Sequence, residues 1–326
     1  MGQNGWNTVA ASLVVAATLC ASPARAQEWP SRPIRVILPF PAGGSTDALL
    51  RMVGDKLQQR LGQPFVVENK PGGATLIGTS EVVRAVPDGH TLLLNSNGIT
   101  LLHMTVKTDF DVRRDLLPVT MLRGGMSGAW INASVPASNI KEFIAYVKAN
   151  RGKVNYASLG PGTPQHIEYE LLKQAIGDEG FDLVGIPYKG EAPSIQALLT
   201  GEVQLFMAAF LQLGPQAAAG KVKLIAAGGA KRAPQFPNVP TYREQGLDYT
   251  HTYWSGFFAP AKMPMETARK LQRELGAVYR LPDVYPVLTR NGEDVGGEPP
   301  EEFRKEILDR IAKMEAVVKR IGLQPQ

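Results

Sequence analysis

The sequence is poor in the groups on which thiol chemistry and many metal sites depend. It holds one cysteine and four histidines in 326 residues. The cysteine, Cys20, lies in an N-terminal apolar run, so the rest of the chain has no disulfide and no cysteine-bound metal. The histidines, His90, His103, His166 and His251, are dispersed, and the His-x-x-x-His spacing of a metal-binding helix is absent. We therefore expect no metal and no cofactor.

Long apolar runs are also missing. Beyond residue 30 no run approaches the roughly 18 uncharged apolar residues that a membrane helix needs. The run from Val9 to Ala21 is too short to span, and Ala24-Arg25-Ala26 after it has the small-x-small pattern of a cleavage site. The sequence predicts that residues 1–26 are a cleaved signal peptide, rather than an uncleaved anchor, and that the protein is exported.

The chain also lacks a strong charge of either sign. Its formal net charge is +5 at pH 7, and loss of Arg25 with the signal peptide would leave +4. No dense tract of Lys and Arg is interleaved with aromatic residues. A mild positive charge favours small anionic ligands over nucleic acid, and we expect no nucleic-acid partner.

From Ile34 onward, short apolar runs alternate with segments of helical periodicity, which is typical of an α/β fold. The predicted strands cover 34–38, 65–67, 91–94, 129–131, 154–157, 183–187, 203–207, 222–227 and 253–260. Helical segments include 48–61, 264–278 and 301–321.

The chain is longer than one core comfortably supports, so two lobes are expected. The composition changes near 123–125, and two crossings near 122–127 and 248–254 would form a hinge. This predicts one lobe from 27–124 plus 250–326 and another from 125–249.

One loop combines a strand end, paired glycines and a helix start, from Phe40 to Asp47. Such a turn directs unpaired backbone N–H groups at one point, where the helix dipole also favours an anion. The spacing of a phosphate-binding P-loop is absent, and so is the Gly-x-Gly-x-x-Gly pattern of dinucleotide sites. Asp47 would repel a bound anion, so it either accepts backbone N–H groups or meets an amino group or water on the ligand.

No catalytic constellation emerges. Ser45, Ser158 and Ser255 lie in no Gly-x-Ser-x-Gly setting, and nothing in the spacing requires a triad of Ser158, His166 and Asp47. Lys189 could form a Schiff base, although anion pairing is its plainer role. What remains is a set of polar loops at strand ends, namely 40–47, 69–75, 95–97, 158–166 and 188–190. Backbone donors and hydroxyls with little acid–base equipment favour binding over turnover.

Distinctive motifs occur in order along nearly the whole chain. These stretches are Trp29-Pro30-x-Arg32-Pro33-Ile34, Phe40-Pro41-Ala42-Gly43-Gly44-x-x-Asp47, Val67-Glu68-Asn69-Lys70-Pro71-Gly72-Gly73, Asn155-Tyr156-Ala157-Ser158-x-Gly160-x-Gly162-x-Pro164-x-His166, Pro187-Tyr188-Lys189-Gly190, Val239-Pro240-Thr241, Trp254-x-Gly256-x-Phe258-Ala259-Pro260-Ala261 and Gly296-Gly297-x-Pro299-x-Glu301-Glu302-Phe303. Together they resemble the Bug family of periplasmic solute-binding proteins, also known as substrate-binding proteins of tripartite tricarboxylate transporters, and the resemblance implies a periplasmic location.

The resemblance implies a type II periplasmic-binding-protein fold, with two α/β lobes joined by a two-strand hinge. It implies capture of a small carboxylated solute between the lobes for a transporter with membrane subunits. In the family, loops of the first lobe hold a carboxylate largely through backbone groups and bridging waters. We expect first-lobe contacts from Phe40, Ala42, Gly43, Gly44, Ser45, Thr46, Asp47, Gly72, Gly73, Ala74, Thr75 and Asn95. We expect second-lobe contacts from Ser158, Gly160, Gly162, Thr163, His166, Tyr188, Lys189 and Ala208.

One position departs from the family pattern. Family members usually carry an Asp after a Met-Phe pair, whereas this chain reads Phe206-Met207-Ala208-Ala209-Phe210. A missing acidic group weakens an amino-acid ligand and favours a di- or tricarboxylate or an aromatic acid. The predicted protein is a monomeric, non-enzymatic solute-binding protein. The alternatives are a secreted enzyme using His166 or Lys189, and an extracytoplasmic sensor subunit.

Overall fold

The computed structural model describes residues 29–160, 163–177, 181–289 and 294–325. The predicted signal peptide lies outside these residues. The strands are β1 (Ile34–Leu38), β2 (Phe65–Asn69), β3 (Thr91–Ser96), β4 (Leu116–Asn132), β5 (Asn155–Ser158), β6 (Val184–Pro187), β7 (Leu205–Ala209), β8 (Val222–Ala227), β9 (Thr252–Pro260) and β10 (Asp294–Val295). The α-helices are α2 (Ser45–Leu61), α3 (Leu76–Val83), α4 (Leu102–Thr105), α5 (Val112–Asp115), α6 (Ile140–Ala149), α7 (Pro164–Ile176), α8 (Glu191–Thr200), α9 (Phe210–Ala218), α10 (Met265–Tyr279), α11 (Tyr285–Leu288) and α12 (Pro300–Arg320). Single 3₁₀ turns are η1 (Gly73–Thr75), η2 (Asn97–Leu101) and η3 (Arg243–Gln245).

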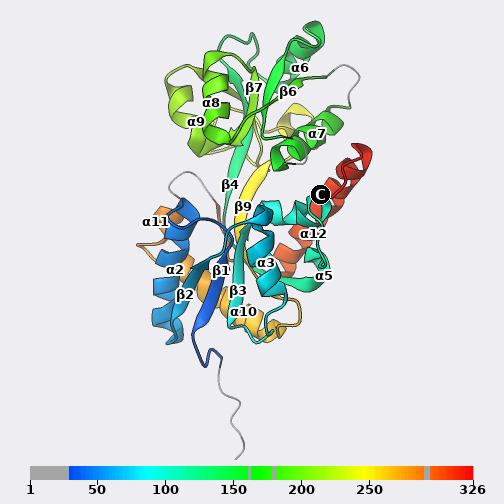
Figure 1. The fold of residues 1–326 in the computed structure, drawn as a ribbon. Coiled ribbons are helices and arrows are strands. Elements are labelled where there is room, and N and C mark those ends of the chain that lie inside the picture. The colour runs from blue at the N-terminus through cyan, green and yellow to red at the C-terminus, as the bar shows by residue number, and fades with distance from the viewer. Residues whose placement is uncertain (1–28, 161–162, 178–180, 290–293, 326) are drawn as a thin grey trace, which may run out of the picture.

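The first sheet has the order β2-β1-β3-β9-β4, with β10 added to β4. β1 is parallel to β2 and β3, and β9 is antiparallel to β3 and β4. Alternate residues of β1 enter different cores, because side chains along a strand point to opposite faces. Val36 joins the core under α2 and α10, whereas Ile37 joins the core under α3 and α12. Helices therefore cover both faces of this sheet (Figure 1).

The second sheet is built on the far end of β4. β7 and β8 pair antiparallel with β4, and β5 is parallel to β6 and β7. Ile131 of β4 packs in the core with residues of α6 and α7, and Trp130 packs on the other face with residues of α8 and α9. This sheet is again covered on both faces, as continuous apolar strands require.

β4 belongs to both sheets. Residues 116–126 pair with β9 in the first sheet, and residues 127–132 pair with β7 and β8 in the second. Figure 1 shows β4 and β9 running between the two halves of the molecule. The sequence predicted a strand only at 129–131, because Pro118 and the glycines Gly124, Gly125 and Gly128 interrupt the β pattern. The glycines allow close packing, since a side chain at Gly125 would collide with the Tyr253 ring of β9.

A second contact joins the two halves through helices. α12 packs against α7, and Ile167 of α7 lies in the core formed by β3, β9 and α12. Buried Glu168 of α7 forms an ion pair with Arg310 of α12, and the Tyr249 hydroxyl lies 3.0 Å from Glu168 Oε2. Arg320 at the end of α12 pairs with Glu170 at 3.1 Å. These contacts hold α7 against a helix of the other half in this conformation.

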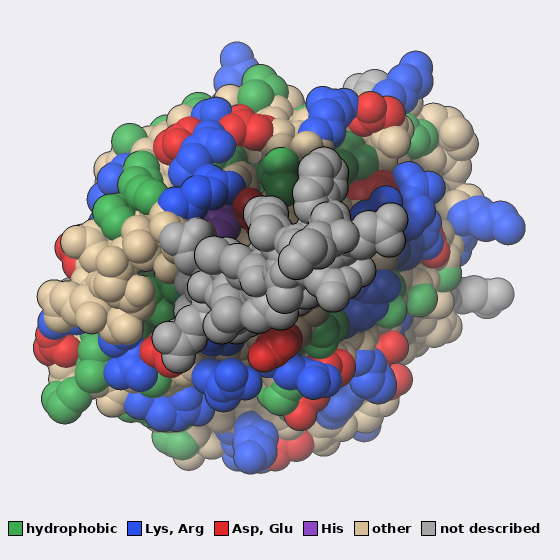
Figure 2. All heavy atoms as spheres, turned by 90° about the horizontal axis from the view of Figure 1, so that it is seen from below, with side chains coloured by type: hydrophobic (Ala, Val, Ile, Leu, Met, Phe, Trp, Pro, Cys, Tyr) green, Lys and Arg blue, Asp and Glu red, His purple; other side chains and the backbone are tan. Residues whose placement is uncertain are grey.

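The surface carries charges of both signs. Figure 2, which views the lower end of the molecule in Figure 1, shows basic and acidic side chains interspersed. Exposed ion pairs include Arg32–Asp88 at 2.7 Å and Arg269–Glu301 at 2.5 Å. Within the part of the chain that the structure describes, no helix is long and apolar enough to cross a bilayer.

Most predicted elements are present, with small shifts at their ends. β1 and β8 have the predicted bounds, and α2 begins three residues before the predicted 48–61. Gly62 ends α2 in a left-handed conformation, at φ 69°. Asn139 caps α6 by accepting the Glu142 N–H at 2.9 Å, as its spacing indicated. Helix α9, which follows β7 directly, was not predicted.

Candidate binding site between the two sheets

The carboxyl ends of the parallel strands in the two sheets face each other across the middle of β4. Ser96, the end of β3, pairs with Ser255, which pairs with Arg123 of β4. Ala209, the end of β7, pairs with Ser127 of β4. Arg123 and Ser127 are four residues apart along the extended strand, about 13 Å at roughly 3.3 Å per residue. The predicted loops of each half therefore leave edges that face one another, which is where open α/β sheets bind ligands.

The first loop leads from β1 into α2. Gly43 has φ 85°, in the left-handed region that favours glycine, and Gly44 is extended and precedes the helix. Residues 41–45 are exposed, and Phe40 packs at the edge of the core. The first N–H groups of a helix have no partner within it, and the dipole of the 17-residue α2 adds positive potential there. Ala42, Gly44, Ser45 and Thr46 would thus offer an anion backbone donors rather than charged side chains, whereas the Gly43 N–H is already donated to Asp47.

Asp47 is bound within the loop itself. Its carboxylate accepts the Gly43 N–H at 3.0 Å, both Nε and Nη2 of Arg51 at 3.2 and 3.1 Å, and Asn69 Nδ2 at 3.0 Å. The Arg51 guanidinium, then the Gly43 and Asn69 donors, lower the pKa of Asp47 to about 2. The sequence left open whether Asp47 accepts backbone N–H groups or meets the ligand. In the structure Asp47 accepts a backbone N–H, and its charge is neutralised by Arg51.

Two residues of this network were absent from the predicted site. Arg51 follows Asp47 by four residues on α2, a spacing that by itself indicates an ion pair. Asn69 ends β2, and its Nδ2 also donates to the Phe40 carbonyl at 3.1 Å. Together they join the first loop to the start of the second.

Replacing Asp47 tests this joining role. Asp47→Asn keeps the shape but loses the charge that holds Arg51, so we expect about tenfold weaker ligand binding. Because the folded pKa is lowered, Asp47 stabilises the protein above its unfolded pKa of about 3.9, and this contribution is lost as the pH falls toward 2. Melting temperatures between pH 5 and pH 2 should therefore fall less steeply in the variant than in the wild type.

The control for this variant is Asp283→Asn. Asp283 forms an exposed pair with Lys56 at 2.5 Å, and that pair also lowers its pKa. Asp283 lies in none of the loops at the facing edges, so the control should bind ligand as the wild type does. Equal affinities of Asp47→Asn and Asp283→Asn would show that Asp47 does not organise the site.

The second loop, 70–75, contains consecutive residues with positive φ. Gly72, Gly73, Ala74 and Thr75 have φ values of 125°, 56°, 51° and 78°. A left-handed conformation is unfavourable for Ala and is a genuine outlier for the β-branched Thr. Asn95 lies behind this loop, fully buried, and its Nδ2 is 3.2 Å from Thr75 Oγ1.

The facing edge carries the loop from β5 into α7. Ser158 is buried and its hydroxyl accepts the Gly160 N–H at 3.1 Å. Thr163 Oγ1 donates to the Gly160 carbonyl at 2.7 Å and accepts the His166 N–H at 3.4 Å, which caps α7. A second helix N-terminus thereby lies at the carboxyl-end edge of the second sheet. Gly162 lies outside the described residues.

The remaining predicted residues are Tyr188, which is hydrogen-bonded, Lys189, which is exposed, and Ala208, which is buried. The Tyr188 N–H donates to the Ser158 carbonyl at 2.8 Å, which ties the 188–190 loop to the loop after β5. The Tyr188 hydroxyl donates to Glu202 at 2.8 Å, and burial together with this carboxylate raises the pKa of Tyr188 to about 12. Lys189 is exposed. Ala208 is buried in β7, where its carbonyl accepts Trp130 Nε1 at 3.0 Å.

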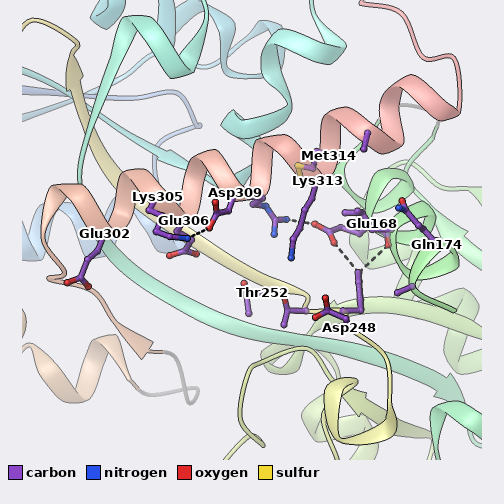
Figure 3. A pocket seen from close by; sticks show the side chains of 16 residues that line it. Glu168, Gln174, Asp248, Thr252, Glu302, Lys305, Glu306, Asp309, Lys313 and Met314 are labelled. Atoms are coloured by element: carbon purple, nitrogen blue, oxygen red, sulfur yellow. Dashed lines mark hydrogen bonds and ion pairs between the residues drawn. The ribbon is translucent and has the colours of Figure 1, made fainter. Parts of the chain in front are cut away.

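A cavity of about 680 Å³ lies elsewhere, between α7, α12 and the segment 248–252 (Figure 3). No predicted site residue that the structure describes lines it. Its lining has five carboxylates, Glu168, Asp248, Glu302, Glu306 and Asp309, and three basic side chains, Lys305, Arg310 and Lys313. Glu168 is paired with Arg310, and Asp309 with Lys305 at 2.5 Å. An excess of carboxylates repels an anion, so this cavity does not fit the predicted ligand.

Metal binding has no support in the part of the chain that is described. There, no three His, Cys, Asp or Glu side chains form a group that could hold a metal ion.

The sequence profile of the tripartite tricarboxylate transporter family receptor matches residues 49–323. The chain is also similar to solved structures. It is 31% identical to the periplasmic binding protein BugD, over 91% of this chain and 100% of that one, with a TM-score of 0.69. It is 28% identical to Rpa4515 of R. palustris, solved with adipate, over 92% and 100% of the two chains, with a TM-score of 0.71. It is 29% identical to MatC of Rhodopseudomonas palustris, solved with malate, over 89% and 100%, with a TM-score of 0.68.

The fold and these matches define a periplasmic solute-binding protein, not an enzyme. The chain belongs to the tripartite tricarboxylate transporter receptor family, the Bug family whose motifs it carries. The predicted family and the predicted binding-protein fold are confirmed.

Proposed function

We propose that this receptor binds a small di- or tricarboxylate, or an aromatic acid, between the two facing edges and delivers it to the membrane subunits of a tripartite tricarboxylate transporter. The observation that carries the proposal is the placement of two helix N-termini, α2 and α7, at edges that face each other across β4. At each edge, a carboxylate group of the ligand would accept backbone N–H groups, and the dipole of the helix that begins there would favour its negative charge.

Two further observations narrow the ligand. The similar proteins Rpa4515 and MatC were solved with adipate and malate, which are both dicarboxylates. In this chain, the position where the family usually has an Asp is Ala208, a buried small side chain. Asp47 is committed to Arg51 and to loop donors, so it does not replace the missing acid for a ligand ammonium group. These features support an acid without an amino group.

Binding between the two edges requires two lobes that can move relative to each other. The lobes are 27–124 plus 250–326 and 125–249, joined at β4 and β9, and they close around the ligand by hinge motion. The chain is exported with residues 1–26 removed, and it acts as a monomer. The site residues are the loops at the two edges, with Gly162 included on the motif alone.

A thermal-shift screen of the chain from Gln27 onward tests the ligand class. A ligand at about a hundred times its Kd adds roughly 2.7 kcal/mol to stability, which raises the melting temperature by several degrees. We expect this rise with at least one member of a panel containing malate, adipate, citrate and benzoate.

Matched compounds sharpen the screen. Aspartate differs from malate by an ammonium group in place of a hydroxyl, and adipamide is adipate without its charges. We expect aspartate to bind more weakly than malate, and adipamide to give no shift. A panel in which no acid raises the melting temperature would refute carboxylate binding, and a preference for aspartate would refute the argument from Ala208.

A further inference from the structure

Thr75 is held in a conformation that its side chain disfavours. Its φ is 78°, and it ends a left-handed run that begins at Gly72. Glycine adopts this region without cost, but a β-branched residue keeps it only when its surroundings impose it. Thr75 also immediately precedes α3, so its conformation decides how the 72–75 turn meets that helix.

The surroundings that impose it are two buried polar side chains. Asn95 Nδ2 donates to Thr75 Oγ1 and to Thr79 Oγ1, each at 3.2 Å, and Asn95 Oδ1 accepts the Ser96 N–H at 2.8 Å. Asn95 and Thr79 are both 0% exposed. Both amide hydrogens and the amide oxygen of Asn95 therefore have protein partners, and the side chain faces the back of the loop.

We propose that Asn95 is a positioning residue of the binding site, acting through Thr75 with Thr79 as its second anchor. This inference rests on the proposed function, because it concerns the loop that would hold the carboxylate. Asn95 fixes Thr75 in the left-handed region, which keeps the N–H groups of the turn Gly73–Thr75 aimed at the facing edge. Without the anchor, Thr75 relaxes toward negative φ and the N–H groups turn away from the ligand.

A side chain can contact the ligand itself, or it can hold the loop that contacts the ligand. The motif alone does not distinguish these two roles for Asn95. A residue that binds a carboxylate needs an exposed or unused donor, and Asn95 is 0% exposed with both amide hydrogens donated to Thr75 and Thr79. The hydroxyl of Thr75 is the atom through which the anchor acts. If residue 75 adopts a positive φ without an anchor, replacing Asn95 should no longer affect binding.

A double-mutant cycle measures this dependence. The ligand is the best carboxylate of the thermal-shift panel, and its Kd is measured by calorimetry on wild type, Asn95→Ala, Thr75→Gly and the double variant. We expect Asn95→Ala to weaken binding about tenfold in the wild-type background, the size of a lost backbone constraint. In the Thr75→Gly background, where glycine needs no anchor, the same substitution should change Kd by less than twofold.

Asn132→Ala is the matched control. Asn132 is also a buried asparagine, and its Nδ2 donates to the Leu198 carbonyl at 2.7 Å at the far end of β4. We expect both alanine variants to melt at lower temperature, but only Asn95→Ala to bind more weakly. All affinities are measured well below the lowest melting temperature, so loss of stability does not enter Kd.

The possible results distinguish failure of the proposed function from failure of the proposed role of Asn95. If the wild type binds no carboxylate, the proposed function fails. If the wild type binds and Asn95→Ala binds equally well, the function stands and the positioning role is wrong. If Asn95→Ala costs the same factor in both backgrounds, Asn95 acts on the ligand by a route other than Thr75, and the inference is overturned.

Discussion

Gly44→Val should abolish carboxylate binding while the protein still folds. Gly44 precedes α2 in extended backbone, with φ −72° and ψ 166°, a conformation that valine also adopts. A Cβ there would meet nothing nearer than the Pro41 carbonyl oxygen at 3.9 Å. The added methyl groups would instead cover the first N–H groups of α2, where the carboxylate is proposed to bind.

The fold and the affinity are measured separately. Far-UV circular dichroism should be unchanged, and stability should fall by about 1 kcal/mol, because valine is a poorer residue than glycine before a helix. The thermal shift given by the wild-type ligand should disappear. Gln59→Val, at an exposed position near the other end of α2, is the control and should keep the full shift. An unchanged affinity in Gly44→Val would show that this loop is only a turn.

Arg310→Met should be strongly destabilising. The Arg310 side chain is 15% exposed and that of Glu168 is 3% exposed, so the pair is largely shielded from water. Removing the guanidinium leaves a buried carboxylate whose remaining side-chain partner is the Tyr249 hydroxyl. Loss of one partner of a buried pair costs about 3–5 kcal/mol, which lowers the melting temperature by roughly 5–8 °C in a chain of this size.

Two further variants identify the cause. Arg269→Met removes a pair on the surface, with side chains 55% and 49% exposed, and should cost less than about 1 kcal/mol. Adding Glu168→Gln to Arg310→Met removes the unpaired charge and should recover at least half of the lost stability. If Arg310→Met melts no lower than Arg269→Met, the contact between α7 and α12 does not depend on this ion pair.

Local patterns in the sequence were sufficient for most of the elements and for the loops at their ends. The alternation at 34–38 and the period of 48–61 each depend on residues that are close in the chain. The loop Phe40–Asp47 follows from them, because a glycine pair between a buried strand and a helix start leaves few other conformations. The family motifs added the second half of the site, which no single pattern would have connected to the first.

The local patterns did not predict which segments that are distant in the sequence lie together. The first part of β4 was not predicted, because Pro118 and three glycines weaken its β pattern, yet its pairing with β9 and β10 overrides that local preference. The contact of α7 with α12 was also missed, since Glu168 and Arg310 lie 142 residues apart and each is an ordinary charge on a helix.

The sequence by itself determined the α/β class, the family and the backbone character of the proposed carboxylate site, because each of these depends on short motifs. Only the tertiary structure decided how those motifs act together. The register along β4 decides that the two sets of strand ends face each other. Two side chains, Arg51 of α2 and Asn69 of β2, decide that Asp47 is a neutralised support, and burial decides that Asn95 stands behind the loop. Hydrogen-bond partners and burial arise from contacts between distant segments, and such contacts exist only in the folded chain.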